Sequence, residues 1–272
     1  YLTLNFVREL ASGCTETAFD QFELEVGARD TIGKLTSELT DNLNVTEDDA
    51  AVNVSNDIMS VTINKATGYI TAYSYNGVDL IADEDGPAPS LARALIGNFS
   101  NANPVKNATS AFKNADLDPS NVNVAVNTAA GYVDVSVTSD VKGKSPCEIS
   151  YRIMSDGNIR IIQSVTPATS GSDFVTQIGM KMTIPGEFEN MTWYGRGSVD
   201  GQHDSYADRK SGEPIGVYTA NVTDRFIEYI NSQECGNTTD VKWASFTDEN
   251  GVGLMAVGDD IDVKALHYTM DQ

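Results

Sequence analysis

The stretch WYGRGSVDGQHDSYADRK, which begins at Trp193, gathers aromatic, cationic and acidic side chains within a short span. Trp193 and Tyr194 offer flat apolar faces of the kind that stack on sugar rings. Asp204, Asp208 and Arg209 can accept hydrogen bonds from sugar hydroxyls or donate to them. These residues are the ingredients of a carbohydrate site.

Arg196 stands between Gly195 and Gly197, so the residues on either side of it carry no Cβ atom. Such a backbone can bend sharply and can let a ligand or a neighbouring strand approach closely. The plainer interpretation is a loop fixed by an ion pair, for example between Arg196 and Asp208. Residue chemistry alone leaves both interpretations open.

The other reactive residues give little support for metal or nucleophile chemistry. Cys14, Cys147 and Cys235 are widely separated and form no C-x-x-C arrangement, which indicates neither a zinc site nor a disulfide framework. His203 and His267 are too few for a histidine-rich metal site, and a Ser-His-Asp triad would depend on one of them. The sequence therefore predicts no metal site and no cofactor of its own.

The charge of the chain limits its partners. Among 272 residues, 18 Lys and Arg face 39 Asp and Glu, a formal net charge of −21. Such a surface repels nucleic acid and anionic lipid headgroups, and no apolar run approaches the roughly 20 residues that span a bilayer. We therefore expect no nucleic-acid partner and no membrane partner. Since the chain starts at Tyr1 with neither an initiator Met nor a leader, we expect it to be cut from a longer protein.

The elements that must position these residues follow a period of two. Leu2, Leu4 and Phe6 alternate with polar residues, as half-buried strands do. The valines within 122–126 and those within 133–137 alternate in the same way and are predicted to pair. Turn signals rich in Asn, Asp and Gly separate such runs at residues 64–68, 76–77, 156–157 and 250–251.

Helical patterns are scarce, and the one modest candidate runs from Ser90 to Phe99. The sequence therefore predicts an all-β protein, most simply a large antiparallel sandwich. A (β/α)₈ barrel and a doubly wound sheet are excluded within these residues.

Four motifs in order resemble one known family. WYGRG followed by SYADRK resembles the W-[FY]-G-R-G-P-x-E-x-Y-x-D-R-K signature of the C-terminal sandwich of glycoside hydrolase family 2 β-galactosidases, the small-chain region. YINSQECGNTTDVKW, from Tyr229, is similar to Y-x-x-P-Q-E-x-G-N-x-x-D-V-R-W in that family, and GPAPSLARALIGN, from Gly86, to G-P-x-P-x-F-W-R-A-P-T-D-N-D. ETAFDQFELEV, from Glu16, resembles the last strands of the immunoglobulin-like domain that precedes the sandwich.

The resemblance implies a particular architecture. It implies a large antiparallel super-sandwich of the galactose mutarotase-like type over residues 51–272. The end of an immunoglobulin-like β-sandwich domain would occupy residues 1–27, and residues 28–50 would form a linker. Because the family sandwich continues for several more strands, we expect this one to be truncated at its C-terminal end.

The resemblance also implies which part of the complete enzyme carries the catalytic residues. A complete enzyme of the family hydrolyses terminal β-D-galactosides with retention, which needs two carboxylates about 5–5.5 Å apart. The family carries both glutamates on a (β/α)₈ barrel, which would lie before Tyr1. We therefore expect a non-catalytic chain, with no catalytic residue of its own, whose partners are that barrel and a β-galactoside or other carbohydrate.

Other properties of a complete enzyme stay open at this point. Any Mg²⁺ and Na⁺ would be bound elsewhere, and a homo-oligomer and either a bacterial cytoplasmic or a secreted location are all compatible with the sequence. Two other functions also stay open: a stand-alone carbohydrate-binding module, which binds sugar without hydrolysis, and a purely structural or oligomerisation domain, which buries an open sheet edge against a partner.

The residues expected to support the active-site rim or to contact carbohydrate come from three of the motifs. In the motif at 86–98 several family residues are replaced, and Arg93 and Asn98 are its polar survivors; His203 falls in an insertion and takes no role. The complete candidate set is Trp193, Arg196, Asp208, Arg209, Glu234, Asn237, Asp240, Arg93 and Asn98.

Overall fold

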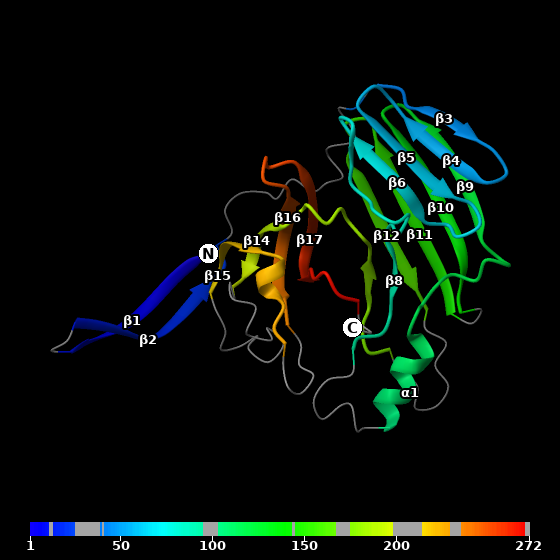
Figure 1. Cartoon of the computed structure of the whole chain (residues 1–272). Coiled ribbons are helices and arrows are strands. Elements are labelled where there is room, and N and C mark those ends of the chain that lie inside the picture. The colour runs from blue at the N-terminus through cyan, green and yellow to red at the C-terminus, as the bar shows by residue number, and fades with distance from the viewer. Residues whose placement is uncertain are drawn as a thin grey trace. The chain divides into compact units, whose positions relative to one another are not determined.

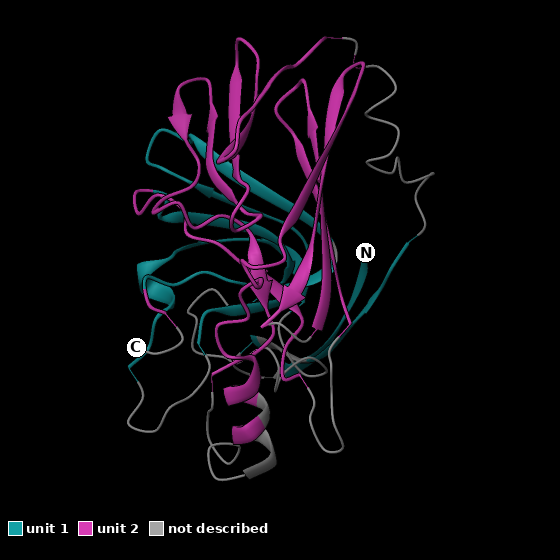
Figure 2. Ribbon diagram, turned by 90° about the vertical axis from the view of Figure 1, so that its right-hand side faces the viewer, with its two compact units in different colours: residues 1–30, 188–229, 234–267 teal, residues 31–187, 230–233, 268–272 magenta. Residues whose placement is uncertain are grey.

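In the computed structural model, nearly all of the described secondary structure elements are β-strands (Figure 1). It describes residues 1–10, 13–24, 39, 41–94, 103–142, 145–166, 175–197, 214–228 and 235–269. Every strand pairing within these ranges is antiparallel, which confirms the predicted all-β class. The chain divides into two compact units (Figure 2): unit 1 comprises residues 1–30, 188–229 and 234–267, and unit 2 comprises residues 31–187, 230–233 and 268–272.

The described strands of unit 2 form three sheets. The first has the order β3-β4-β5-β6-β7, the second has the order β12-β11-β10-β9, and β13 pairs with β8. The strands of the five-stranded sheet are β3 (Asn44–Glu47), β4 (Ala51–Ser55), β5 (Met59–Asn64), β6 (Ile70–Tyr75) and β7 (Val78–Asp79). The other strands are β8 (Ala88–Ser90), β9 (Asn123–Ala129), β10 (Tyr132–Val141), β11 (Ser145–Met154), β12 (Ile159–Val165) and β13 (Gly179–Lys181).

Turns connect these strands at the positions predicted from the sequence. Between β5 and β6, the Asn64 side-chain oxygen accepts hydrogen bonds from the backbone N–H groups of Ala66 (2.8 Å) and Thr67 (3.2 Å). Between β6 and β7, Asn76 and Gly77 both have positive φ, 49° and 79°, as the tight hairpin turn of an Asn-Gly pair requires. The predicted pairing of the two valine runs is confirmed by the β9–β10 register.

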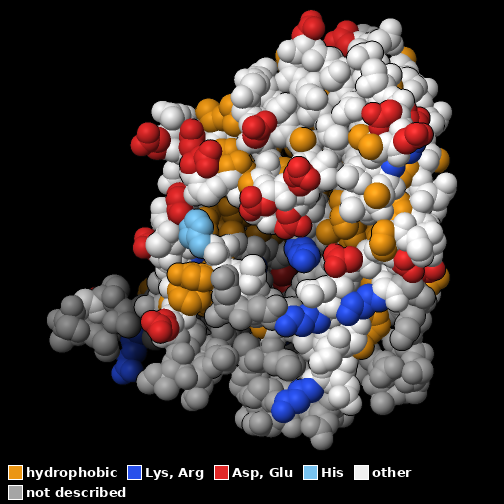
Figure 3. Space-filling view, turned by 45° about the vertical axis from the view of Figure 1, so that its right-hand side comes forward, with side chains coloured by type: hydrophobic (Ala, Val, Ile, Leu, Met, Phe, Trp, Pro, Cys, Tyr) orange, Lys and Arg blue, Asp and Glu red, His pale blue; other side chains and the backbone are white. Residues whose placement is uncertain are grey.

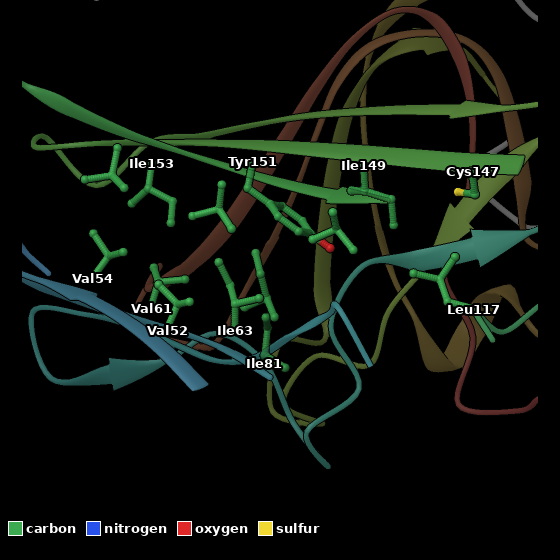
Figure 4. Packing of buried hydrophobic residues seen from close by; sticks show 14 of the residues in the cluster. Val52, Val54, Val61, Ile63, Ile81, Leu117, Cys147, Ile149, Tyr151 and Ile153 are labelled. Atoms are coloured by element: carbon green, nitrogen blue, oxygen red, sulfur yellow. The ribbon is translucent and has the colours of Figure 1, made fainter. Parts of the chain in front are cut away.

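The core of unit 2 lies between the two larger sheets. Val52 and Val61 on β4 and β5 have no exposed surface, and Ile149, Tyr151 and Ile153 on β11 are equally buried. Figure 4 shows the β11 side chains pointing toward those of β4 and β5. Because alternate residues of each strand point inward, the period-two pattern of the sequence becomes one continuous apolar layer.

Tyrosine hydroxyl groups tie the two sheets of this core together at its edges. The Tyr151 hydroxyl on β11 donates to the Gly68 carbonyl in the β5–β6 turn at 3.2 Å. The Tyr73 hydroxyl on β6 donates to the carbonyl of Gly157, in the turn between β11 and β12. Each bond satisfies a polar group that would otherwise be buried without a partner, so the ring can fill the core at little cost.

Unit 1 contains a four-stranded sheet of order β15-β14-β16-β17 and a separate hairpin, β1-β2. The Gln21 side chain on β2 bonds the hairpin to the edge strand β15. The Gln21 amide donates to the Ile215 carbonyl at 3.0 Å and accepts from the Ile215 N–H at 2.6 Å. The strands are β1 (Leu2–Leu10), β2 (Gly13–Phe22), β14 (Asn190–Arg196), β15 (Ile215–Asn221), β16 (Asn237–Thr247) and β17 (Gly253–Lys264).

Two local features differ from the sequence-based expectation. Strand β3, Asn44–Glu47, lies inside the predicted linker 28–50 and pairs with β4, so the sheet begins before residue 51. The one described α-helix is α1, Asn103–Phe112, and not Ser90–Phe99. Ser90 belongs to β8 and residues 91–94 are not helical, while residues 95–99 lie outside the described residues. Pro104, in the first turn of α1, suits a helix start because that turn needs no backbone donor.

The packing of the unit 2 core predicts that truncating two isoleucines to alanine will lower stability by very different amounts. Ile149 is 1% exposed and Ile162, on the outer side of β12, is 49% exposed. Ile149→Ala should lower the free energy of unfolding by about 2–5 kcal/mol, because it leaves a cavity in the core. Ile162→Ala should cost less than about 1 kcal/mol. Urea denaturation measures both, and equal losses would contradict the assignment of the core.

The buried acids of unit 2 predict a loss of stability in alkali. Burial raises the pKa of Tyr69 and Tyr73 to about 12 and that of the Cys147 thiol to about 11, and burial also raises the pKa of Tyr151. The folded state therefore holds these protons more tightly than the unfolded chain does. Their contribution to the free energy of unfolding is complete below about pH 8 and is lost as the pH rises through about 9–12.

The urea midpoint should accordingly fall over that alkaline range. Tyr151→Phe removes one of the titrating groups and should make the decline shallower, although it also removes a hydrogen bond. A midpoint that stays constant up to about pH 11 would contradict this account of the buried phenols.

Candidate functional site

The alternation of β14 separates the residues of the WYGRG motif onto opposite sides of its sheet. Trp193 and Gly195 point to the buried side, while Tyr194 and Arg196 point to the other. Trp193 has no exposed surface, so in this structure its ring offers no face to a sugar. Its place is in the core of unit 1, and the sugar-stacking role predicted for it finds no accessible surface.

The Trp193 ring is held between an aromatic ring and a cation. Its neighbour on β15, Tyr218, stacks against it with ring centroids 5.6 Å apart. The guanidinium carbon of Arg225, which lies in the short 3₁₀ helix Thr223–Arg225, is 4.7 Å from the ring centroid. The indole N–H donates to the backbone carbonyl of Arg196 at 3.0 Å.

Arg225 is fully buried, which is costly for a charge unless it has partners. Its Nη2 donates to the Gly236 carbonyl at 2.9 Å, directly before β16. A desolvated cation over a tryptophan face contributes about 2 kcal/mol. Arg225 therefore links the indole on β14 to the start of β16, and no sequence motif marks this residue.

Gly195 serves close strand packing. A Cβ atom at this position would lie 2.9 Å from the Cα of Val241 and 3.1 Å from the Thr239 carbonyl oxygen, both on β16. Of the two roles that the sequence allows for this glycine, the structure shows the close approach of a neighbouring strand.

Arg196 and Asp240 form an ion pair where β14 ends beside β16. The Arg196 Nε donates to Asp240 Oδ2 at 2.8 Å, and their side chains are 18% and 28% exposed. The Thr239 hydroxyl donates to the same carboxylate oxygen at 3.2 Å. Asp240 has a φ of +56° and lies where the register of β16 shifts between Thr238 and Val241. This β-bulge turns the carboxylate toward Arg196.

The ion pair expected for Arg196 thus has a partner from another motif. Asp240, from the motif at 229–243, is one partner of Arg196. A pairing of Arg196 with Asp208 stays a prediction, because Asp208 lies outside the described residues. Arg209, Glu234 and Asn98 lie outside them as well.

Two further candidates have described positions. Asn237, at the start of β16, is 5% exposed and pairs in register with Lys264. Arg93 belongs to unit 2, where its backbone N–H donates to the Thr176 hydroxyl at 3.1 Å. The structure therefore brings Trp193, Arg196 and Asp240 together in one unit and places Arg93 in the other.

Trp243 is a residue that reasoning from the sequence did not select. It lies on β16 directly opposite Tyr194 on β14, and both rings are half-buried on the side of the sheet away from Trp193. The period-two pattern suggests which residues of β14 share a side. On β16 that pattern is interrupted between Val241 and Trp243 by a second register shift, so the sequence alone does not fix the side of Trp243.

Acidic side chains are spread over the face shown in Figure 3, in keeping with the net charge of −21. In the portion of the chain that the structure describes, no three His, Cys, Asp or Glu side chains are grouped so that they could hold a metal ion. Within the same residues, no helix has the length and apolar character needed to cross a bilayer.

The tight contact at Gly195 leads to a test with a matched control. Gly195→Ala places a methyl group against the β16 backbone and should lower the free energy of unfolding by about 1–3 kcal/mol. Gly186→Ala meets no atom within 4 Å and should change it by less than about 0.5 kcal/mol. Thermal or urea unfolding measures both, and a neutral Gly195→Ala would show that β14 and β16 are not packed this closely.

Known proteins resemble the chain over nearly its whole length. It is 29% identical over 261 residues to a β-galactosidase of Priestia megaterium, which covers 95% of this chain and 24% of that relative. A β-galactosidase of Halalkalibacterium halodurans is 26% identical over 234 residues, covering 84% of this chain and 22% of the relative. A β-galactosidase of Streptococcus thermophilus is 27% identical over 214 residues, covering 78% and 20%.

The chain thus spans about a quarter of the length of the first two relatives. Residues 55–272 match the family described as beta galactosidase small chain, which includes the Arg196–Asp240 ion pair and both strands that carry it. With this match over most of its length, the chain belongs to the β-galactosidase small chain family.

Proposed function

We propose that this chain is a non-catalytic sandwich module of a β-galactosidase, which supports the rim of an active site supplied by the rest of a longer protein. The match of residues 55–272 to the small chain family carries the proposal. The relatives are named β-galactosidases, and the matched region is 24% of the P. megaterium relative. The larger part of such a protein, with ample room for a catalytic domain, would lie outside this region.

The geometry of Asp240 supports a structural role for this carboxylate. A retaining glycosidase needs one carboxyl group that donates a proton and a second that attacks, about 5–5.5 Å apart. The Asp240 Oδ2 atom instead accepts hydrogen bonds from Arg196 and Thr239. These bonds commit the carboxylate to holding two strands together.

The ion pair is well placed for rim support. Arg196 is the last residue of β14, and Asp240 lies in the bulge of the adjacent β16. A paired charge at this point fixes the ends of two neighbouring strands relative to each other. Catalytic groups work best when the elements around them are held in place in advance, so a fixed strand end is suited to the border of an active site.

The purified chain should not hydrolyse nitrophenyl β-galactoside above the buffer rate. The P. megaterium β-galactosidase at the same molarity is the positive control. Turnover that stays with the chain through purification and disappears in Asp240→Asn would overturn the non-catalytic assignment.

The rim role has a separate readout in a chimera, in which this chain replaces the matching region of the P. megaterium enzyme. In an active chimera, Arg196→Met should lower kcat by about tenfold or more, because misplacing a supporting loop by about 1 Å is costly to the chemistry. Ile162→Ala, on an outer strand of unit 2, should leave kcat unchanged. A chimera that keeps full activity with Arg196→Met would contradict the supporting role.

A further inference from the structure

The side of the unit 1 sheet that faces away from Trp193 carries an ordered set of side chains. Register places Val217, Tyr194, Trp243 and Val257 in one row across β15, β14, β16 and β17. The adjacent row across the same four strands is Thr219, Thr192, Ser245 and Met255. We call these two rows the outer platform.

The outer platform is open to solvent among the described residues. Val217 and Val257, at the two ends of the aromatic row, are 63% and 54% exposed, and Met255 is 58% exposed. The opposite side of the same sheet is closed, since Met191 and Ala244 have no exposed surface. One side of the sheet therefore forms the core, and the other presents two half-buried aromatic rings flanked by exposed aliphatic groups.

The hydroxyl groups of Thr219, Thr192 and Ser245, which we call the hydroxyl row, are held in place by their own hydrogen bonds. The Thr192 and Thr219 hydroxyls are 3.0 Å apart and hydrogen-bonded, and the Ser245 hydroxyl donates to the Thr192 carbonyl at 3.3 Å. A hydroxyl group has one hydrogen and two lone pairs, so these groups keep capacity for a ligand. A fixed line of hydroxyls beside a pair of aromatic rings suits a ligand that has both apolar C–H faces and hydroxyl edges.

Two ion pairs join charged residues on the strands of the platform. Arg196 pairs with Asp240 at 2.8 Å, and Lys242 pairs with Asp260 at 2.6 Å. Each pair joins one positive and one negative group, and the net charge of −21 disfavours an anionic ligand. The net charge of −21 also opposes contact with a second copy of the chain. A neutral polyhydroxylated ligand meets these conditions better than an anionic one or a second acidic copy.

We propose that the outer platform, with Tyr194 and Trp243 at its centre, binds neutral β-galactosides through ring stacking and the adjacent hydroxyl row. The ligand class rests on the proposed function, since a module of a β-galactosidase meets galactosides and their oligomers. Sugar rings lie against the two aromatic side chains, while Thr192, Thr219 and Ser245 exchange hydrogen bonds with their hydroxyls. The platform is separate from the core of unit 1, so binding needs no rearrangement of Trp193.

Calorimetric titration of the purified chain with lactose, and with a longer β-galacto-oligosaccharide, tests the proposal. The dissociation constant for lactose should be on the order of 1 mM, because an open surface buries little of a small sugar, and the longer ligand should bind more tightly. Trp243→Ala should weaken binding by about tenfold or more. Ile162→Ala removes an exposed apolar side chain in unit 2 and should have no effect.

A second measurement needs no variant. The chain has two tryptophans, and Trp193 is fully buried, so acrylamide should quench mainly Trp243. Lactose should protect this fluorescence over the concentration range that gives calorimetric heat. Trp243→Phe, which keeps a ring on the sheet, should bind with intermediate affinity and guards against loss of fold in the alanine variant.

Three results would overturn the proposal: no sugar binding up to about 50 mM, binding that Trp243→Ala leaves unchanged, or self-association in sedimentation analysis that Trp243→Ala abolishes. The last result would assign the platform to a protein contact. None of these would affect the non-catalytic assignment, which the hydrolysis assay decides.

Discussion

The burial of Trp193 is the constraint on which the unit 1 sheet depends. The indole ring lies against Tyr218 and beneath the Arg225 guanidinium, and its N–H is bonded to the Arg196 carbonyl. Because successive residues of a strand point to opposite sides, this one side chain also fixes Tyr194 and Arg196 on the other side. A slip of one residue would place the indole in solvent and Tyr194 in the core. The ion pair and the outer platform both follow from this choice.

Much of the fold could be predicted because strand and turn signals are local. Alternating valines gave β9 and β10, and Asn-Gly or Asp-Gly pairs marked the ends of hairpins. Strand β3 was missed because Asn44–Glu47 contains only one large apolar residue and is stabilised by pairing with β4. The helix Asn103–Phe112 was missed because its composition is mostly small and polar, so its pattern is weak.

The candidate site could be predicted only in part, because its contacts join residues far apart in the chain. Motifs identified Arg196 and Asp240 separately, but their pairing depends on β14 lying beside a bulge in β16. The adjacent pair Trp193–Tyr194 also left open which ring would face the core, since either choice satisfies a period of two. The buried Arg225 could not be recognised, because the described contacts of its guanidinium include a ring on β14 and a backbone carbonyl, neither of which the sequence pattern links to it.

The hydrogen bonds between Gln21 and β15 limit which residues can replace Gln21, although its partial exposure suggests that many would be tolerated. Gln21 is only partly buried, yet its amide meets both the N–H and the carbonyl of Ile215, as a neighbouring strand would. Only an amide side chain offers a donor and an acceptor together in this geometry. Glutamate would set a second acceptor against the carbonyl, and lysine would set a donor against the N–H. Either replacement would therefore remove the paired bonds that join the hairpin to Ile215.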